Sequence, residues 1–254
     1  MTAGTEHDIA GTGIDDLMGR RVRLRQPDRG YRAGLDAALL AAAVELAPDE
    51  RGLEAGCGVG GALLQVAARC PGARLVGLER DPQAVELAVG NIALNGMEDR
   101  VLIRAGDVAL RFSHLALPPF DAAFANPPFF DDPRALRAPD PSRRGAWMAD
   151  DGLAAWCEFL LKAVREGGRV TLVHRADRLA DLLALLAPKA GSFRLRPVHP
   201  FPDAPAKRVL VRAVKTGKAP LVLLPPLILR DRGAEADRPE VAALLRGEAA
   251  LGWD

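Results

Sequence analysis

The stretch Gly52-Leu53-Glu54-Ala55-Gly56-Cys57-Gly58-Val59-Gly60-Gly61 decides the fold of this chain. Its first four residues have the composition of a short buried strand, four glycines follow within six residues, and a helical run extends over residues 62–68. A strand, a glycine-rich turn and a helix form the first half of a βαβ unit, in which small residues let a ligand approach the N–H groups of the helix N-terminus. The stretch therefore predicts an α/β fold with a nucleotide-like ligand at this turn.

The glycines of the turn fit two cofactor patterns. Gly56, Gly58 and Gly61 match the dinucleotide fingerprint. Glu54 followed by Gly56, Gly58 and Gly60 matches the acid-x-Gly-x-Gly-x-Gly pattern of S-adenosylmethionine enzymes. A structural turn that holds no ligand is the third interpretation, and the turn by itself leaves all three open.

Two acidic residues follow the next two predicted strands. The strand at 74–78 leads to Glu79, about twenty residues past the glycines, where a carboxylate can accept hydrogen bonds from both ribose hydroxyls. The strand at 101–104 leads to Asp107, which would lie beside an adenine ring and accept from its exocyclic amine. The alternative for Asp107 is an ordinary turn or cap residue.

A fourth predicted strand runs into Asn126-Pro127-Pro128-Phe129, with Phe130 behind it. The two prolines lack backbone donors and fix their φ angles, so the strand must stop and the chain is held stiffly. In such a turn the Asn126 side-chain oxygen and the Pro127 carbonyl can both accept from one planar NH2 group, and the aromatic residues can stack on a flat ring. A plain strand-ending turn is the alternative interpretation.

The alternation of strands and helices predicts a Rossmann-like, doubly wound α/β architecture. We expect a seven-stranded, mostly parallel sheet with an antiparallel edge strand, the antiparallel pair lying at about 193–198 and 208–214. A chain of 254 residues can hold one such domain with additions. Its apolar fraction of 49% and charged fraction of 26% argue against a disordered chain.

The net charge of +1 provides no global attraction for nucleic acid, so any such partner must meet a local patch. Residues 20–32 hold six arginines against one aspartate. Arg21, Arg23 and Arg25 alternate with apolar residues, which suits a strand with one cationic face. That face predicts RNA contacts, although charged edge strands also occur simply because they oppose aggregation.

Compartment and metal content follow from what the sequence lacks. No apolar stretch approaches the length of a membrane-spanning helix, and the N-terminus lacks the basic flank and apolar core of a secretory signal. Cys57, Cys70 and Cys157 are widely spaced and form no metal-ligand pattern with the four histidines. We therefore expect a cytoplasmic protein with reduced thiols, no membrane contact and no metal.

The turn at Asn126 distinguishes between the two cofactor chemistries. A nicotinamide enzyme has no use for Asn-Pro-Pro-Phe, whereas a methyltransferase acting on a planar amine does. The nitrogen lone pair of such an amine is delocalised into its π system, so two acceptors for its hydrogens would favour rehybridisation as the nitrogen attacks a methyl group. Such an enzyme needs positioning more than a strong base.

These elements together resemble the class I S-adenosylmethionine-dependent amino-methyltransferases. The segments 26–40 and 91–96, the latter reading Asn-Ile-Ala-Leu-Asn-Gly, resemble more narrowly the bacterial tRNA(Val) adenine-N6 methyltransferase family. This resemblance implies methyl transfer from S-adenosylmethionine to the exocyclic N6 amine of an adenosine in tRNA, in the anticodon loop. The composition along the chain suggests a division into a flexible N-terminus (1–16), a basic strand and helix (17–50), and the methyltransferase domain with a C-terminal extension (51–254).

The resemblance assigns roles to individual positions. The catalytic residues would be Asn126, Pro127, Pro128 and Phe129. The cofactor would be bound by Tyr31, Glu54, Gly56, Cys57, Gly58, Gly60, Glu79, Asp107 and Asn126. The clustering of charge, rather than the resemblance, predicts that Arg21, Arg23, Arg25 and the arginine-containing segment 131–149 bind phosphates of the tRNA, and Phe129 and Phe130 would stack on the substrate ring. The roles of Arg32 and Asp36 stay open, since Asp36 equally suits a helix cap.

Other acceptors and a non-enzymatic role stay open as alternatives. An Asn-Pro-Pro-aromatic turn could also receive a glutamine side-chain amide of a protein or guanine N2 of ribosomal RNA. A module that binds S-adenosylmethionine without turnover is the third alternative. The basic strand favours RNA over protein, and the intact Asn126 argues against a module without activity.

Overall fold

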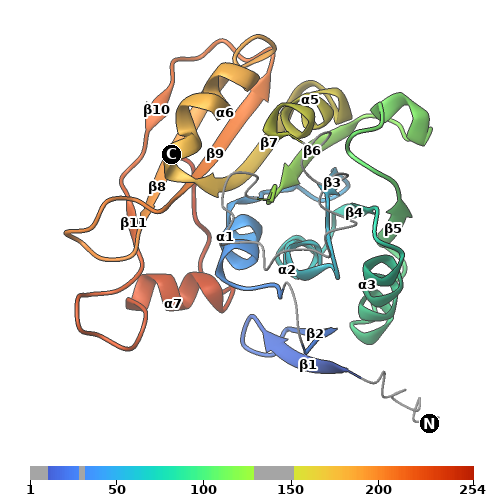
Figure 1. Cartoon of the computed structure of the whole chain (residues 1–254), viewed down its shortest axis with the longest axis horizontal. Helices are drawn as coiled ribbons and strands as arrows, with labels where there is room; N and C mark the ends of the chain where they lie inside the picture. Colours follow the sequence, from blue (N-terminus) through green and yellow to red (C-terminus); the bar gives the residue numbers. More distant parts are fainter. Residues whose placement is uncertain (1–10, 29–31, 129–151) are drawn as a thin grey trace, which may run out of the picture.

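A mostly parallel β-sheet runs through the centre of the molecule, with helices on both faces (Figure 1). The computed structural model describes residues 11–28, 32–128 and 152–254. Within them the sheet consists of β3 (Arg51–Ala55), β4 (Arg74–Glu79), β5 (Val101–Ala105), β6 (Phe120–Ala125), β7 (Val164–Arg175), β8 (Ala190–His199), β9 (Arg208–Lys215), β10 (Val222–Leu223) and β11 (Leu227–Ile228).

The strand order is β10-β8-β9-β7-β6-β3-β4-β5, and β11 also pairs with β8. The strands β5, β4, β3, β6 and β7 are mutually parallel, whereas β9 runs antiparallel to both β7 and β8. The predicted doubly wound, mostly parallel sheet and its antiparallel pair are therefore confirmed. The seven predicted strands correspond to β3–β9, and the two-residue strands β10 and β11 extend the sheet beyond β8 to nine strands in the described residues. The antiparallel strand β9 therefore lies two positions in from the edge rather than at it.

Two hydrophobic cores lie on the two faces of the sheet. The helices α1 (Leu35–Ala43), α2 (Gly61–Arg69) and α3 (Pro82–Leu94) cover one face, and α5 (Leu153–Ala163) and α6 (Leu179–Leu186) cover the other (Figure 1). Because successive strand residues point to opposite faces, Phe124 belongs to the core under α1 and α2, while Ala123 and Ala125 belong to the core under α5 and α6. Short 3₁₀ turns cover Phe112–Leu115 and Ala176–Arg178.

A separate two-stranded hairpin precedes the sheet and packs on α2 and α3. Its strands are β1 (Thr12–Leu17) and β2 (Val22–Pro27). The predicted alternation in β2 is confirmed, because Val22 and Leu24 are buried while Arg23 is exposed. The end of the segment 1–16, which we expected to be flexible, instead forms β1 in register with β2. Cross-strand pairing supplies the order that the polar sequence of β1 does not indicate by itself.

The C-terminal extension returns to the α1 and α2 side of the molecule through α7 (Pro239–Leu245) (Figure 1). Trp253 is buried, and its indole N–H donates to the Ala43 carbonyl at 2.8 Å. Arg69, at the end of α2, donates to the carbonyls of Leu244 and Ala249. These long-range contacts attach the extension to the core. Among the described residues, no helix has both the length and the hydropathy needed to span a membrane.

Candidate functional site

Three adjacent strands end together at the carboxyl edge of the sheet. Ala55 of β3 lies in register with Leu78 of β4 and with Ala125 of β6. The next residue of the central strand β3 is Gly56, which therefore lies between Asn126 after β6 and Glu79 of β4. Neighbouring strands of a sheet are about 4.8 Å apart. The structure thus brings the predicted cofactor turn, the predicted ribose acid and the predicted amine site to one place.

The glycine turn has the backbone that only glycine adopts readily. Gly56, Gly58 and Gly60 have φ angles of +65°, +54° and +91°. A Cβ on Gly56 would lie 2.3 Å from the Trp156 ring, whereas a Cβ on Gly58 would meet nothing within 4 Å. Packing therefore requires glycine at position 56, while the Gly58 side of the turn faces open space where a ligand can approach.

Cys57 contributes to the turn through its backbone. Its N–H donates to the Leu78 carbonyl at 2.9 Å, and its carbonyl accepts from Gly60 at 2.9 Å. Burial raises the pKa of the Cys57 thiol well above its usual value, and the nearby carboxylates of Glu54 and Glu79 add to this effect. The thiol therefore stays protonated, and the residue shapes the turn rather than supplying a nucleophile.

Glu79 holds the glycine turn in place. Its Oε2 accepts from the Gly58 N–H at 2.8 Å, and its Oε1 accepts from the N–H groups of Arg80 and Asp81 at 2.9 Å each. The hydrogen bond between Gly58 and Glu79 could not be predicted from the sequence, because nothing local to residue 79 indicates a contact with residue 58. A carboxylate oxygen accepts more than one hydrogen bond, so the predicted ribose contact is compatible with this arrangement.

Asp107 has the structure of a turn residue. Its Oδ1 accepts from the Ala109 N–H at 2.9 Å, and its Oδ2 lies 3.4 Å from Arg80 Nη1. The Gly106 N–H donates to the Glu79 carbonyl at 2.9 Å, which holds this turn beside the end of β4. The turn interpretation is confirmed, and the adenine contact stays a prediction.

Glu54 is a buried acid whose surroundings fit a cationic ligand. The residue is 3% exposed, and its Oε2 has no hydrogen-bond partner among the described residues. Burial raises the pKa of this carboxyl well above its usual value, the charge of Glu79 raises it further, and a hydrogen bond from the Leu63 backbone only partly opposes them. A positively charged group at the turn would supply the missing partner. The ammonium of a methionine moiety has this chemistry, so the residues fit S-adenosylmethionine.

The strand stop at Asn126 is confirmed. β6 ends at Ala125, Asn126 and Pro128 are half-buried, and Pro127 is buried. Four parts of the predicted site, namely Tyr31, Phe129, Phe130 and the segment 131–149, lie outside the described residues. Their roles stay predictions.

The predicted basic face divides into two parts. The Arg21 guanidinium donates to the Gly247 carbonyl at 2.8 Å, so this arginine fastens the hairpin to the C-terminal extension. Arg23 and Arg25 lie within β2, and their backbone N–H groups are bound by the side chains of Asn95, the C-cap of α3, and of Asn91 within α3. The sequence pattern predicted that all three arginines contact RNA, whereas in the structure the Arg21 side chain binds the C-terminal extension.

The structure also places Arg32 and Asp36, whose roles the sequence left open. Arg32 donates to the Pro27 carbonyl at 3.0 Å and forms an ion pair with Asp15, so it fastens the segment after the hairpin. Asp36 accepts from Arg208 Nε with both oxygens at 3.0 Å. The N-cap of α1 is Gly34 and has no side-chain cap bond, so the helix-cap interpretation of Asp36 is wrong.

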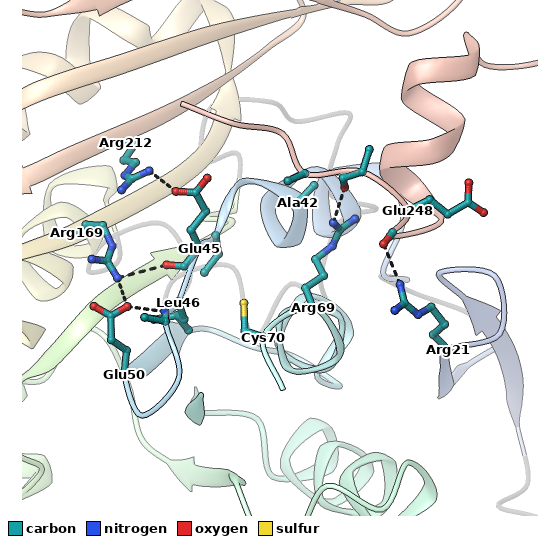
Figure 2. Close-up of a pocket in the computed structure, with 15 residues that line it drawn as sticks. Arg21, Ala42, Glu45, Leu46, Glu50, Arg69, Cys70, Arg169, Arg212 and Glu248 are labelled. Carbon is teal, nitrogen blue, oxygen red and sulfur yellow. Dashed lines mark hydrogen bonds and ion pairs between the residues drawn. The ribbon is translucent and has the colours of Figure 1, made fainter. Parts of the chain in front are cut away.

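A cavity of about 570 Å³ opens at the opposite, amino end of the strands (Figure 2). Two pairs of its charged groups bind one another: Arg169 pairs with Glu50 at 2.5 Å, and Arg212 donates to Glu45 at 2.8 Å (Figure 2). Ligands of doubly wound sheets bind at the carboxyl ends of the strands. This cavity is therefore separate from the candidate site. Across residues 11–28, 32–128 and 152–254, no group of three His, Cys, Asp or Glu residues could hold a metal ion.

Comparison with known proteins identifies the relatives of this chain. Residues 32–137 match the family model of the methyltransferase small domain. A tRNA1(Val) (adenine(37)-N6)-methyltransferase of Porphyromonas gingivalis is 34% identical over 202 residues, which cover 75% of this chain and 77% of that protein. A protein of the same name from Bacteroides fragilis is 31% identical over 186 residues, covering 71% and 76% of the two chains.

Solved structures show the same fold. A predicted O-methyltransferase from Agrobacterium tumefaciens has a TM-score of 0.72 and 29% identity, covering 85% of this chain and 98% of that one. The TYW2 protein of Pyrococcus horikoshii, solved with MeSAdo, has a TM-score of 0.52 at 14% identity, covering 83% and 74%. At 14% identity, the similarity to the TYW2 protein shows a shared fold only.

Proposed function

Because the chain belongs to the tRNA1(Val) (adenine(37)-N6)-methyltransferase family, we propose that it transfers a methyl group from S-adenosylmethionine to N6 of adenine 37 in tRNA1(Val). The observation that carries the proposal is the register of three strands, in which Gly56 follows the central strand between Asn126 on one side and Glu79 on the other. An amine-binding turn next to a cofactor turn is the arrangement that methyl transfer to nitrogen requires.

The cofactor side of the proposal rests on the glycine turn and two acids. The glycine turn, with its open space at Gly58, would receive the adenosine and methionine parts of the cofactor. Glu79 would accept from the ribose while it holds Gly58, and Asp107 would accept from the adenine amine. Glu54 would bind the cofactor ammonium through its unpartnered oxygen. When bound, the cofactor supplies an electrophilic methyl group on a sulfonium.

The amine side of the proposal rests on Asn126 and Pro127. Their side-chain and backbone oxygens would each accept one hydrogen of the N6 amine, which localises the nitrogen lone pair toward the methyl group. The bound cofactor would supply the methyl group and would keep the electron pair of the broken C–S bond on its sulfur, and the nitrogen, once bonded to the methyl group, would lose one proton to solvent. No strong base is required, because the proton leaves after the nitrogen has become cationic.

One feature favours an amine over a hydroxyl as the group that is methylated, and a second favours RNA over protein as the substrate. A hydroxyl has one hydrogen, so it would use only one of the two acceptors that the Asn-Pro turn offers. The arginines of β2 favour RNA over a protein glutamine. An anticodon-loop adenine is unpaired, so bringing it into a pocket costs less than flipping a base out of a duplex. Arg23, Arg25 and the segment 131–149 would hold the phosphates of the loop.

The test is a pair of variants at the amine site. Asn126→Ala removes one acceptor, so we expect kcat for tRNA1(Val) methylation to fall by about 10²–10³-fold. Affinity for S-adenosylhomocysteine, measured by calorimetry, should change far less than kcat. Asn126→Asp keeps an acceptor oxygen and should retain more activity than Asn126→Ala. A loss of less than about threefold in Asn126→Ala would contradict the proposal.

A further inference from the structure

Two asparagines, Asn91 within α3 and Asn95 at its C-cap, bind the backbone of β2 in a repeated way. Asn91 is fully buried, accepts from the Arg25 N–H at 2.7 Å and donates to the Arg25 carbonyl at 2.8 Å. Asn95 accepts from the Arg23 N–H at 2.8 Å and donates to the Arg23 carbonyl at 2.7 Å. Each amide thus satisfies both backbone groups of one arginine.

The spacing explains why a helix can pair with a strand in this way. Four residues along a helix advance about 6 Å, and two residues along a strand advance about 6.7 Å. Side chains at positions 91 and 95 therefore reach alternate residues of β2, on the edge that faces away from β1. The two amides take the place of a third strand. A two-stranded hairpin is only marginally stable by itself, so this edge pairing stabilises its position.

The two asparagines differ in one contact. The Asn91 Nδ2 also donates to the carbonyl of Val59 at 2.9 Å, in the glycine turn between Gly58 and Gly60. The Asn95 Nδ2 instead donates back to the carbonyl of Asn91 at 2.7 Å, in the last turn of the helix that Asn95 caps. Asn91 therefore joins the glycine turn to the hairpin with both hydrogens of one amide group, and Asn95 joins only the helix to the hairpin.

We infer that Asn91 is a positioning residue that couples cofactor binding at the glycine turn to the docking of the arginine-bearing hairpin. A ligand that orders Val59 and its neighbours also orders the acceptor of the Asn91 amide. The same amide then holds Arg25 more firmly, and the effect is reciprocal by thermodynamic linkage. The inference rests on the proposed function in one respect, namely that the glycine turn binds an adenosine cofactor.

The test is hydrogen exchange of the peptide covering residues 12–27, with and without saturating S-adenosylhomocysteine. In the unmodified protein the ligand should slow exchange of this hairpin peptide. In Asn91→Ala the ligand should no longer slow it, and affinity for S-adenosylhomocysteine should fall by about tenfold, as expected for one buried hydrogen bond. In the matched control Asn95→Ala, exchange should be faster overall, but the ligand should still slow it and bind with nearly unchanged affinity.

The outcomes separate this inference from the proposed function. If calorimetry shows that the unmodified protein does not bind S-adenosylhomocysteine, the proposed function and the inference both fail. If the ligand binds the unmodified protein and hydrogen exchange of the hairpin does not change, only the inference fails. This comparison uses the unmodified protein alone, so it does not depend on whether a variant folds. Equal loss of ligand protection in Asn91→Ala and Asn95→Ala would also overturn it, because a merely structural role would affect both alike.

Discussion

Alanine at two glycines of the cofactor turn should separate folding from ligand binding. Gly56 and Gly58 have similar φ angles of +65° and +54°, so each substitution carries a backbone cost of about 1–2 kcal/mol. At position 56 the new Cβ would also lie 2.3 Å from Trp156, and such overpacking costs about 1–3 kcal/mol more. We therefore expect Gly56→Ala to lower the free energy of unfolding by about 2–5 kcal/mol, and Gly58→Ala by about 1–2 kcal/mol.

The assay combines urea denaturation with calorimetric titration of S-adenosylhomocysteine. Because the Cβ of Gly58→Ala enters open space, we expect its cost to appear in ligand affinity, with a loss of about tenfold or more. Gly56→Ala should lose mainly stability. Equal unfolding free energies for the two variants would refute the packing argument. Unchanged affinity in Gly58→Ala would show that the space beside this glycine does not hold the cofactor.

Three further predictions follow from charges. The pKa of Glu54 in the folded protein lies above its ordinary value of 4.5, so the free energy of unfolding of the ligand-free protein should fall as pH rises above that value. In urea titrations of Glu54→Gln this pH dependence should be absent. The same variant should bind S-adenosylhomocysteine about 10–100-fold more weakly. Burial lowers the pKa of His174 from 6.5 to about 4, so its contribution to stability is complete above pH 6.5 and falls by about 3 kcal/mol as pH drops to 4, a loss that should be absent in His174→Gln. Neutralising Arg23 and Arg25 with glutamine should reduce the salt slope of tRNA binding by about 1.4–1.8, whereas Arg21→Gln should leave the slope nearly unchanged and lower stability instead.

Local patterns predicted the parts of the structure that depend on neighbouring residues. The strand, glycine turn and helix around Gly56 were predictable because the period and the glycines lie within one short stretch. The strand stop at Asn126 was predictable because the two prolines cannot continue a strand. The order of these elements along the chain then placed both at one sheet edge, since parallel strands share their carboxyl ends.

The contacts that the sequence did not reveal join residues far apart in the chain. Gly56 is required by Trp156, 100 positions later, and Asp36 binds Arg208 rather than capping its own helix. A carboxylate near a helix start has the same local sequence pattern whether it caps the helix or pairs with a distant arginine, so the sequence does not distinguish these two roles. The pairing of Asn91 with β2 is likewise invisible locally, because its partner backbone carries no side-chain signature.

The central claim is that this chain methylates one adenine in one tRNA, and position-resolved methyl transfer tests it most directly. The chain would be incubated with methyl-labelled S-adenosylmethionine and two transcripts of tRNA1(Val), one with adenine and one with guanine at nucleotide 37. Nuclease digestion and mass spectrometry would then locate the label. We predict N6-methyladenosine at nucleotide 37 of the first transcript and no label in the second. Equal labelling of both transcripts, or label only in ribosomal RNA or protein fractions, would contradict the claim.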